Sequence, residues 1–208
     1  MRPRGASEDS AARSWYDPHV RAQRAPAPVD WKQFLLLDED DPRELIDGRL
    51  EETEVPTKLH EWVVGCLVAA LFAWARANKA GTVLPSGYKL RISRTRGVMA
   101  DVVFIRRGRG HLAKNEGMED AAPDLVIEVI SPSSRRHDRV RKLHWYGELG
   151  VREYWIVDPE ERTLERLMLD KRGRYVVSEA LSEDDVFTPK GYDGLVIRLD
   201  ELWAMPEE

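Results

Sequence analysis

Two carboxylates lie within apolar runs that are typical of buried strands. Asp101 lies in the run 98–105, and Glu128 lies in the run 125–130. Continuous Val/Ile/Leu runs favour strands covered on both faces, where an ionised side chain is costly unless a cation or hydrogen bonds compensate it. Each acid therefore needs a partner, which is either an arginine at the end of a sheet or a bound cation.

Basic residues surround both acids. The segment 89–109 carries seven Lys or Arg residues against Asp101, and the segment 135–142 carries five against Asp138. Carboxylates bind Mg²⁺, the cation lowers the pKa of a bound water, and basic side chains hold phosphates, as phosphodiester hydrolysis requires. Lys142, 14 residues after Glu128, could stabilise the developing charge on phosphorus or position the attacking water.

The elements around Glu128 predict how these groups are positioned. A strand over 124–131 ends at a Ser-Pro-Ser-Ser break, a helix over 135–149 ends at Gly150, and a strand follows over 151–158. A strand–helix–strand unit of this length predicts a parallel pair with a right-handed crossover. On the helix, Asp138, Lys142 and Tyr146 are four residues apart and share a face.

The rest of the chain supplies further elements of both kinds. Asp-Gly at 47–48 predicts a hairpin within 44–51, and Thr57 caps a helix that runs to Asn78. His60 and Glu61 lie in the first turn of that helix, where capping or surface roles compete with a role in the site. Further strands are predicted over 82–92 and 98–105, with a hairpin formed by 163–169 and 175–177.

Length and composition favour one globular domain over 29–208, preceded by a disordered arm over 1–28. The single cysteine, Cys66, excludes a disulfide framework and favours a reduced, cytoplasmic setting. We expect no membrane partner, because no stretch approaches roughly 20 uninterrupted apolar residues and the N-terminus lacks a signal-peptide core. The net charge of -5 argues against a nucleic-acid coat but says little about a local site.

The residues resemble the Uma family of restriction-endonuclease-like proteins, within the PD-(D/E)XK nuclease superfamily. The resemblance is carried by residues 101–103, 123–134, 138, 142, 146 and 150–159, and it extends upstream to 44–48 and His60. It implies an α/β fold with a restriction-endonuclease-like core, in which helices flank a mixed central β-sheet. It also implies Mg²⁺ or Mn²⁺ held by Asp101, Glu128 and the carbonyl of Val129.

The sequence departs from the superfamily pattern at two positions. Ala100 replaces the proline before the first acid, and Ile130 replaces the lysine two residues after the second. An aliphatic side chain cannot act as that lysine does, so the resemblance implies that Lys142 has taken its role. Some superfamily members add a metal contact from the first helix, which makes His60 and Glu61 accessory candidates beside Tyr146.

These observations predict a Mg²⁺-dependent DNA endonuclease in which Asp101 and Glu128 bind the metal and Lys142 assists catalysis. We expect DNA as the partner and a homodimer, because nucleases that cut both strands often pair. Two alternatives stay open: a catalytically inactive module with this fold that binds nucleic acid or protein, and a phosphoesterase for a small substrate. Four arginines are expected to contact backbone phosphates, which give affinity without sequence information: Arg91, Arg106, Arg135 and Arg139.

Overall fold

The computed structural model describes residues 27–38, 41–53, 55–131 and 134–206. The predicted arm, residues 1–28, lies outside this part of the chain except for its last two residues. Pro132 and Ser133, within the predicted break after the strand, also lie outside it.

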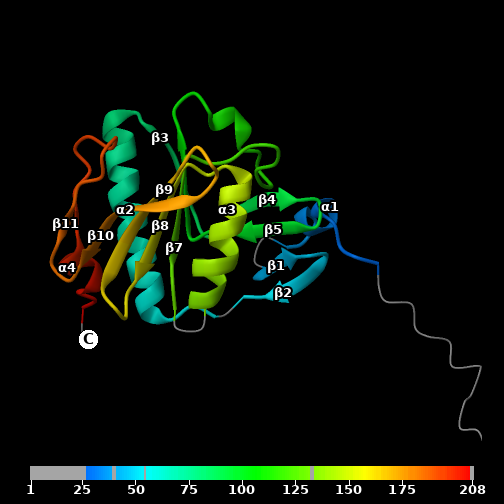
Figure 1. The fold of residues 1–208 in the computed structure, drawn as a ribbon, viewed down its shortest axis with the longest axis horizontal. Helices are drawn as coiled ribbons and strands as arrows, with labels where there is room; N and C mark the ends of the chain where they lie inside the picture. The colour runs from blue at the N-terminus through cyan, green and yellow to red at the C-terminus, as the bar shows by residue number, and fades with distance from the viewer. Residues whose placement is uncertain (1–26, 39–40, 54, 132–133, 207–208) are drawn as a thin grey trace, which may run out of the picture.

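A six-stranded mixed sheet forms the centre of the molecule (Figure 1). β7 and β8 are parallel, as the strand–helix–strand unit predicts, and the other neighbouring strands are antiparallel. The predicted mixed central sheet is therefore confirmed. Across the sheet the strands are β10 (Tyr175–Ser182), β9 (Thr163–Leu169), β8 (Glu153–Asp158), β7 (Leu125–Val129), β6 (Val102–Arg106) and β3 (Gly81–Pro85).

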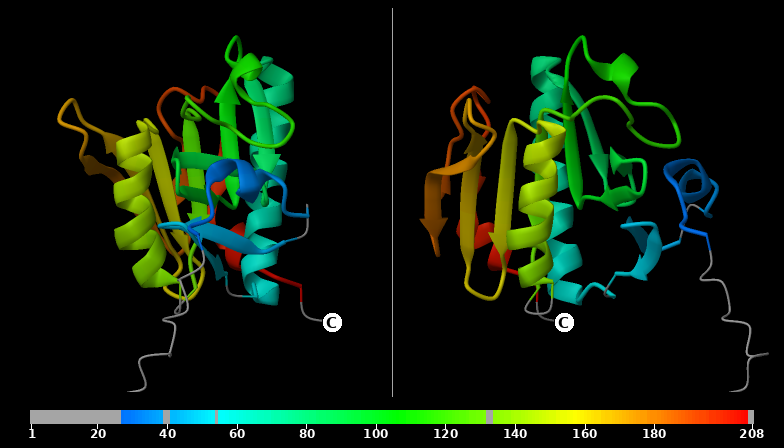
Figure 2. Two further views of the ribbon diagram at one scale, coloured as in Figure 1. Left: turned by 90° about the vertical axis from the view of Figure 1, so that its right-hand side faces the viewer. Right: turned by 45° about the vertical axis from the view of Figure 1, so that its right-hand side comes forward.

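The two faces of this sheet are covered by different helices (Figures 1 and 2). One face packs against α2 (Lys58–Asn78), whose cap Thr57 accepts a hydrogen bond from the His60 N–H as predicted. The other face packs against a helix that begins with a π-helical segment (His137–Lys142) and continues as α3 (Leu143–Leu149). Both predicted long helices are present, although the second contains a wider turn than predicted.

A smaller sheet lies beside the central one. Its strands are ordered β2 (Arg49–Glu52), β1 (Arg43–Ile46), β5 (Arg96–Met99) and β4 (Lys89–Ser93), and α1 (Trp31–Leu35) packs against it. The β1–β2 hairpin turns at Asp47 and Gly48, which both have positive φ as an Asp-Gly turn requires. The remaining elements are a 3-10 helix (Gly110–Leu112), β11 (Val186–Phe187), β12 (Ile197–Arg198) and α4 (Leu199–Trp203).

Side chains of β7 alternate between two cores. Leu125, Ile127 and Val129 join the apolar cluster on the α2 side, whereas Val126 belongs to the cluster on the α3 side. Since side chains alternate along a strand, Glu128 also faces α3. The fold thus turns a carboxylate toward the helix that carries Lys142.

Two predicted strands are wrong in extent. The run 98–105 is divided between β5 and β6, which lie in different sheets, with Ala100 and Asp101 between them. The run 82–92 is likewise divided between β3 and β4, because the chain turns at Gly87 with φ 94. Apolar content alone does not reveal where a chain crosses from one sheet to another.

In the described part of the chain, α2 alone has the length and hydropathy of a membrane span. Core helices of globular domains can share this property. Here Val63, Leu67 and Leu71 of α2 are buried against the sheet.

Candidate active site

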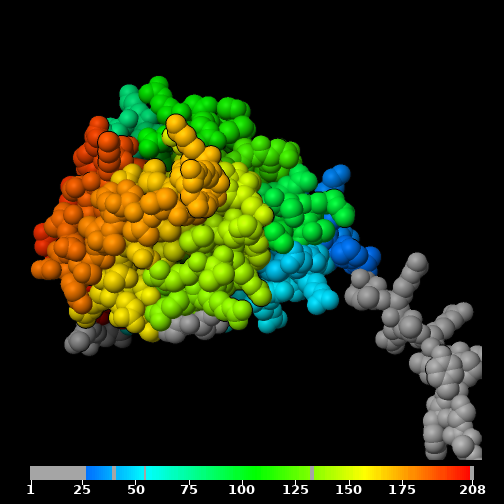
Figure 3. All heavy atoms as spheres, viewed as in Figure 1, coloured from blue at the N-terminus to red at the C-terminus, as the bar shows by residue number. Residues whose placement is uncertain are grey.

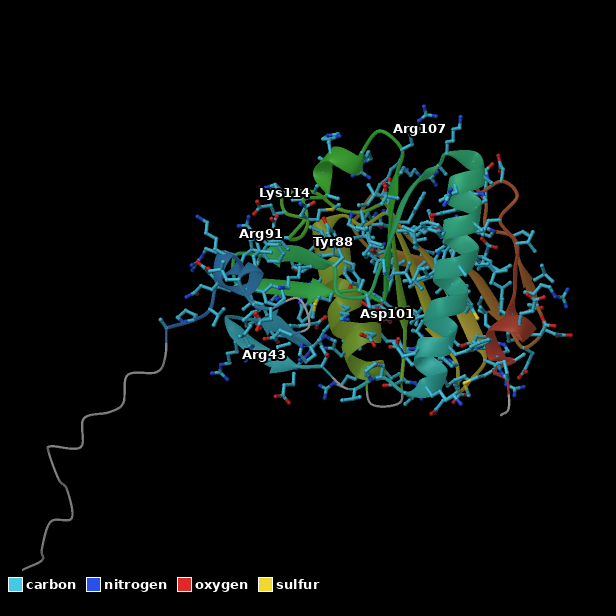
Figure 4. All side chains as sticks on the ribbon, turned by 180° about the vertical axis from the view of Figure 1, so that it is seen from behind. Arg43, Tyr88, Arg91, Asp101, Arg107 and Lys114 are labelled. Carbon is cyan, nitrogen blue, oxygen red and sulfur yellow. The ribbon has the colours of Figure 1, made fainter. Side chains whose placement is uncertain are left out.

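Asp101 lies where the chain leaves the small sheet and enters β6. Antiparallel pairing places Val102 opposite Ile127, so the start of β6 lies beside the end of β7. Asp101 Oδ2 accepts a hydrogen bond from the Val129 N–H at 2.7 Å, and 18% of the side chain is exposed. Figure 4 shows Asp101 between the small sheet and α2. The strand that carries Glu128 therefore holds Asp101, while part of its carboxylate stays in contact with solvent.

Glu128 is almost completely buried, with 3% of the side chain exposed. Its Oε1 accepts a hydrogen bond from the Tyr146 hydroxyl at 2.5 Å and lies 3.0 Å from Lys142 Nζ. Burial raises the pKa of Glu128 well above its ordinary value, Asp101 and Asp138 add to the rise, and Lys142 opposes it. A further positive charge would therefore stabilise the ionised form of Glu128.

Lys142 lies at the end of the π-helical segment, with its ammonium among buried acceptors. Its Nζ donates to the Met99 carbonyl at 3.2 Å and lies 3.6 Å from Asp138 Oδ1. Burial lowers the pKa of Lys142, but Glu128 and the other nearby carboxylates outweigh burial and raise it well above its ordinary value. The side chain is therefore a fixed ammonium.

Lys142 and Tyr146 share a face of the helix, as their spacing predicts, and both contact Glu128. Ile130 is 1% exposed within the core on the α3 side, where an ionised lysine would lose its contact with water. The π-helical segment replaces the regular helix that the sequence predicts, and its last bond joins the Leu143 N–H to the Asp138 carbonyl, five residues back. Such wide turns are frequent at functional sites.

Glu44 and His137 are site residues that the sequence reasoning missed. Glu44 Oε1 lies 3.3 Å from Lys142 Nζ, and Oε2 lies 3.2 Å from His137 Nε2. Burial raises the pKa of Glu44, but Lys142 and His137 outweigh burial and lower it below its ordinary value. A signal was present, because Glu44 precedes the buried Leu45 and Ile46 in a strand and so repeats the anomaly of Glu128.

The accessory candidates on α2 differ in their placement. His60 Nε2 lies 3.4 Å from Asp101 Oδ2, and its Nδ1 lies 3.4 Å from the half-exposed Glu61 carboxylate. Burial lowers the pKa of His60, but Asp101 and Glu61 outweigh burial and raise it above its ordinary value. His60 thus contacts Asp101 directly, whereas Glu61 reaches the site only through His60.

Residues 31–200 match the family model Uma2, described as "Putative restriction endonuclease". The chain belongs to the Uma2 family. The resemblance seen in the sequence is therefore confirmed. No curated protein sequence matches this chain.

A solved structure supports the fold of this Uma2 chain. It is the crystal structure of a putative nuclease belonging to DUF820 from Anabaena variabilis, with a TM-score of 0.68 and 18% identity over 85% of this chain and 98% of that one. The predicted α/β restriction-endonuclease-like fold is thereby confirmed. The type IIG restriction endonuclease BpuSI also matches, with a TM-score of 0.36 and 14% identity over 62% of this chain and 14% of that one.

Two of the predicted DNA-contacting arginines of the Uma2 chain lie at the end of the sheet that carries Asp101. Arg135 Nη2 lies 2.8 Å from Asp158 Oδ2, and Arg139 pairs with Glu165 of β9. Asp158 ends β8, which is parallel to β7 and paired with it up to Val129. These arginines are therefore anchored by acids near the site.

The other two arginines lie elsewhere. Arg106 ends β6, five residues from Asp101, and stacks over Tyr192 at 5.1 Å. Arg91 of β4 lies 3.5 Å from both Glu119 and Asp120. In Figure 4 the neighbouring Arg107 lies at the far end of β6 from Asp101, and Arg91 lies on the small sheet. The structure thus does not bring Arg91 and Arg106 together with Asp101.

The donors of the Uma2 site fit a cation that keeps much of its water. Within the described ranges, no three carboxylate, imidazole or thiolate groups are gathered closely enough to hold a metal ion by themselves. Mg²⁺ is commonly bound through one or two carboxylates and several waters, which Asp101 and Glu128 could supply. Charge also favours a cation, because Asp101, Glu44, Glu128 and Asp138 all act on the single ammonium of Lys142.

Proposed function

We propose that this protein is a Mg²⁺- or Mn²⁺-dependent DNA endonuclease that hydrolyses phosphodiester bonds. The observation that carries the proposal is the contact between Lys142 Nζ and Glu128 Oε1 at 3.0 Å, beside a strand end where Val129 also holds Asp101. This contact places a lysine beside Glu128 although Ile130 occupies the usual lysine position. Membership of the Uma2 family supports the same chemistry.

The residues that would hold the cation are Asp101 and Glu128, with the carbonyl of Val129. Such a cation lowers the pKa of a bound water and neutralises charge on the phosphate. Asp101 contributes a carboxylate fixed by the Val129 N–H, and Tyr146 orients the carboxylate of Glu128. Preorganised ligands of this kind need little rearrangement when substrate binds.

Lys142 would assist the reaction as a fixed positive charge. Its ammonium contacts Glu128 and the Met99 carbonyl, so it lies at the edge of the proposed cation site. A charge there stabilises the negative charge that develops on the phosphoryl oxygens, or orients the attacking water through a hydrogen bond. Because the ammonium stays protonated, Lys142 acts as a hydrogen-bond donor and not as a general base.

Contacts to DNA would come from Arg135 and Arg139 beside the site. Both side chains are about one-third exposed and paired with acids. Arginine binds phosphate through two parallel hydrogen bonds, and these contacts fix the position of the duplex without reading its sequence. Two copies of the chain would be needed to cut both strands at one encounter.

Nicking of supercoiled plasmid tests the proposal. The wild-type protein should nick plasmid with Mg²⁺ or Mn²⁺ but not with chelator, and Asp101→Ala and Glu128→Ala should remove the activity. Activity that survives in either variant would contradict the assignment.

A titration with Mn²⁺ by calorimetry separates the alternatives. Absence of Mn²⁺ binding together with retained DNA binding would favour an inactive binding module. Cleavage of a chromogenic phosphodiester with plasmid left intact would favour a small-molecule phosphoesterase.

A further inference from the structure

Glu44 reaches the candidate site from outside the central sheet. It belongs to β1 of the small sheet, yet its side chain is 3% exposed and lies against the helix that carries Lys142. Figure 3 shows the β1–β2 hairpin (cyan) directly beside α3 (yellow-green) on the same face. The small sheet therefore contributes a buried carboxylate to a site whose proposed metal ligands come from β7 and from the residue just before β6.

Both carboxylate oxygens of Glu44 already have partners. Oε1 accepts a hydrogen bond from the Met99 N–H at 2.9 Å and lies 3.3 Å from Lys142 Nζ. Oε2 lies 3.2 Å from His137 Nε2, and the His137 ring stands edge-on to Trp145 at 5.5 Å. A carboxylate occupied in this way has little capacity left for a cation.

The backbone of Met99 contacts both Glu44 and Lys142. Its N–H binds Glu44, while its carbonyl accepts a hydrogen bond from Lys142 Nζ at 3.2 Å. One backbone residue at the end of β5 therefore fixes both the carboxylate and the ammonium. The Lys142 ammonium that contacts Glu128 is therefore also contacted by two groups of the small sheet.

A lysine side chain that reaches the site from a helix needs contacts that fix the position of its ammonium. Its flexible stem has many rotamers, and this conformational entropy opposes keeping the ammonium at one point. We propose that Glu44 is a positioning residue that holds the Lys142 ammonium against Glu128, so that the small sheet completes the catalytic arrangement. The catalytic consequence rests on the proposed nuclease function, whereas the positioning itself does not.

A double-mutant cycle tests whether Glu44 acts through Lys142. Single-turnover nicking with Mg²⁺ should be slower by about 10- to 100-fold in Glu44→Ala, as is common when a supporting residue is removed. Glu44→Gln keeps an acceptor for the Met99 N–H and should lose less activity. If Glu44 acts through Lys142, adding Glu44→Ala to Lys142→Ala should cause no further loss. A further loss would overturn the proposal, because it would give Glu44 a separate role such as metal binding.

Glu153 offers a matched control for the loss of stability that follows when any buried carboxylate loses its charge. It is also a buried strand carboxylate with a buried cationic partner, Arg166, at 2.7 Å. Glu153→Gln should lower the melting temperature at least as much as Glu44→Gln and leave the nicking rate within twofold of wild type. An equal loss of nicking in both variants would overturn the proposal, since it would show only the general cost of a broken buried pair.

A nuclear magnetic resonance readout separates positioning from activity. The Lys142 ammonium, buried and hydrogen bonded, should give a ¹H–¹⁵N correlation in metal-free protein that is absent in Lys142→Met. That signal should broaden or disappear in Glu44→Gln and persist in Glu153→Gln. An unchanged signal in Glu44→Gln would overturn the proposal even in an active enzyme. If wild-type protein does not cut plasmid but the signal responds as expected, the nuclease function fails and the positioning stands.

Discussion

The ammonium of Lys142 lies 3.0 Å from Glu128 Oε1, although 14 residues and a change of element separate them along the chain. A strand buried on both faces turns Glu128 toward the helix, and the π-helical segment ends at the lysine that meets it. Around this pair the protein buries more acids than bases. The excess of acids favours the binding of a further cation, and the consequences of this excess can be measured.

Replacing Lys142 by methionine should destabilise the protein and slow nicking. The side-chain volume is largely kept, but Glu44, Glu128 and Asp138 lose their shared cation, and breaking a buried pair in this way costs about 3–5 kcal/mol. Urea unfolding at neutral pH measures the destabilisation. Lys114→Met is the control, since Lys114 is 59% exposed and an exposed ion pair such as that with Glu119 contributes little to stability. Equal destabilisation of the two variants would contradict this prediction.

Tyr146→Phe should weaken catalysis through Glu128. The ring keeps its packing against Tyr154 at 5.3 Å, but Glu128 loses the donor at 2.5 Å. Removing a group that orients a metal ligand commonly lowers activity by about 10- to 100-fold. Tyr175→Phe is the matched control for Tyr146→Phe, because the Tyr175 hydroxyl donates to the Val151 carbonyl, away from the site. Both variants should lose about 1–3 kcal/mol of stability, and only Tyr146→Phe should cut plasmid more slowly.

The pH dependence of stability should report on Glu44. Its pKa is lowered in the folded protein, so its contribution is fully present above the ordinary value of 4.5 and is lost as pH falls through the folded value. The difference in unfolding free energy between wild type and Glu44→Gln should therefore shrink as the pH is lowered below about 4.5. Urea titrations from pH 7 downward measure this difference. A difference that does not change with pH would mean that the charge of Glu44 adds nothing to stability.

Salt dependence should distinguish the arginines beside the site from those far from it. Removing one phosphate-binding side chain should reduce the slope of log affinity against log salt by about one. We expect this reduction for Arg135→Ala and Arg139→Ala, measured by fluorescence anisotropy with duplex DNA and Ca²⁺ in place of Mg²⁺. Arg106→Ala should change the slope less, because Arg106 stacks on Tyr192 at the other end of β6. Equal changes in all three variants would place the DNA across a different surface.

Much of the fold follows from local sequence signals. The hairpin at Asp47 and Gly48, the cap at Thr57 and the parallel pair of β7 and β8 are all confirmed. These signals succeed because turn geometry, capping and continuous apolar runs act over a few residues. The division of 82–92 and 98–105 between two sheets could not be predicted, because it depends on tertiary packing.

In the candidate site, too, some contacts follow from local sequence and others depend on tertiary packing. Glu128, Lys142 and Tyr146 come together because a strand and the helix that follows it fix their relation. Glu44 lies 98 residues before Lys142 and reaches it only through the packing of the small sheet against α3. Sequence spacing carries no information about such a contact, although a lone acid before buried Leu45 and Ile46 marks Glu44 as unusual.

The location of a bound Mn²⁺ tests the central claim most directly. Crystals soaked in Mn²⁺ should give an anomalous scattering peak that contacts the carboxylates of Asp101 and Glu128, with water in most other coordination positions. Glu128→Gln crystals treated in the same way should lack the peak. A strong Mn²⁺ peak elsewhere, or none in protein that still nicks plasmid in Mn²⁺, would contradict the assignment of this site.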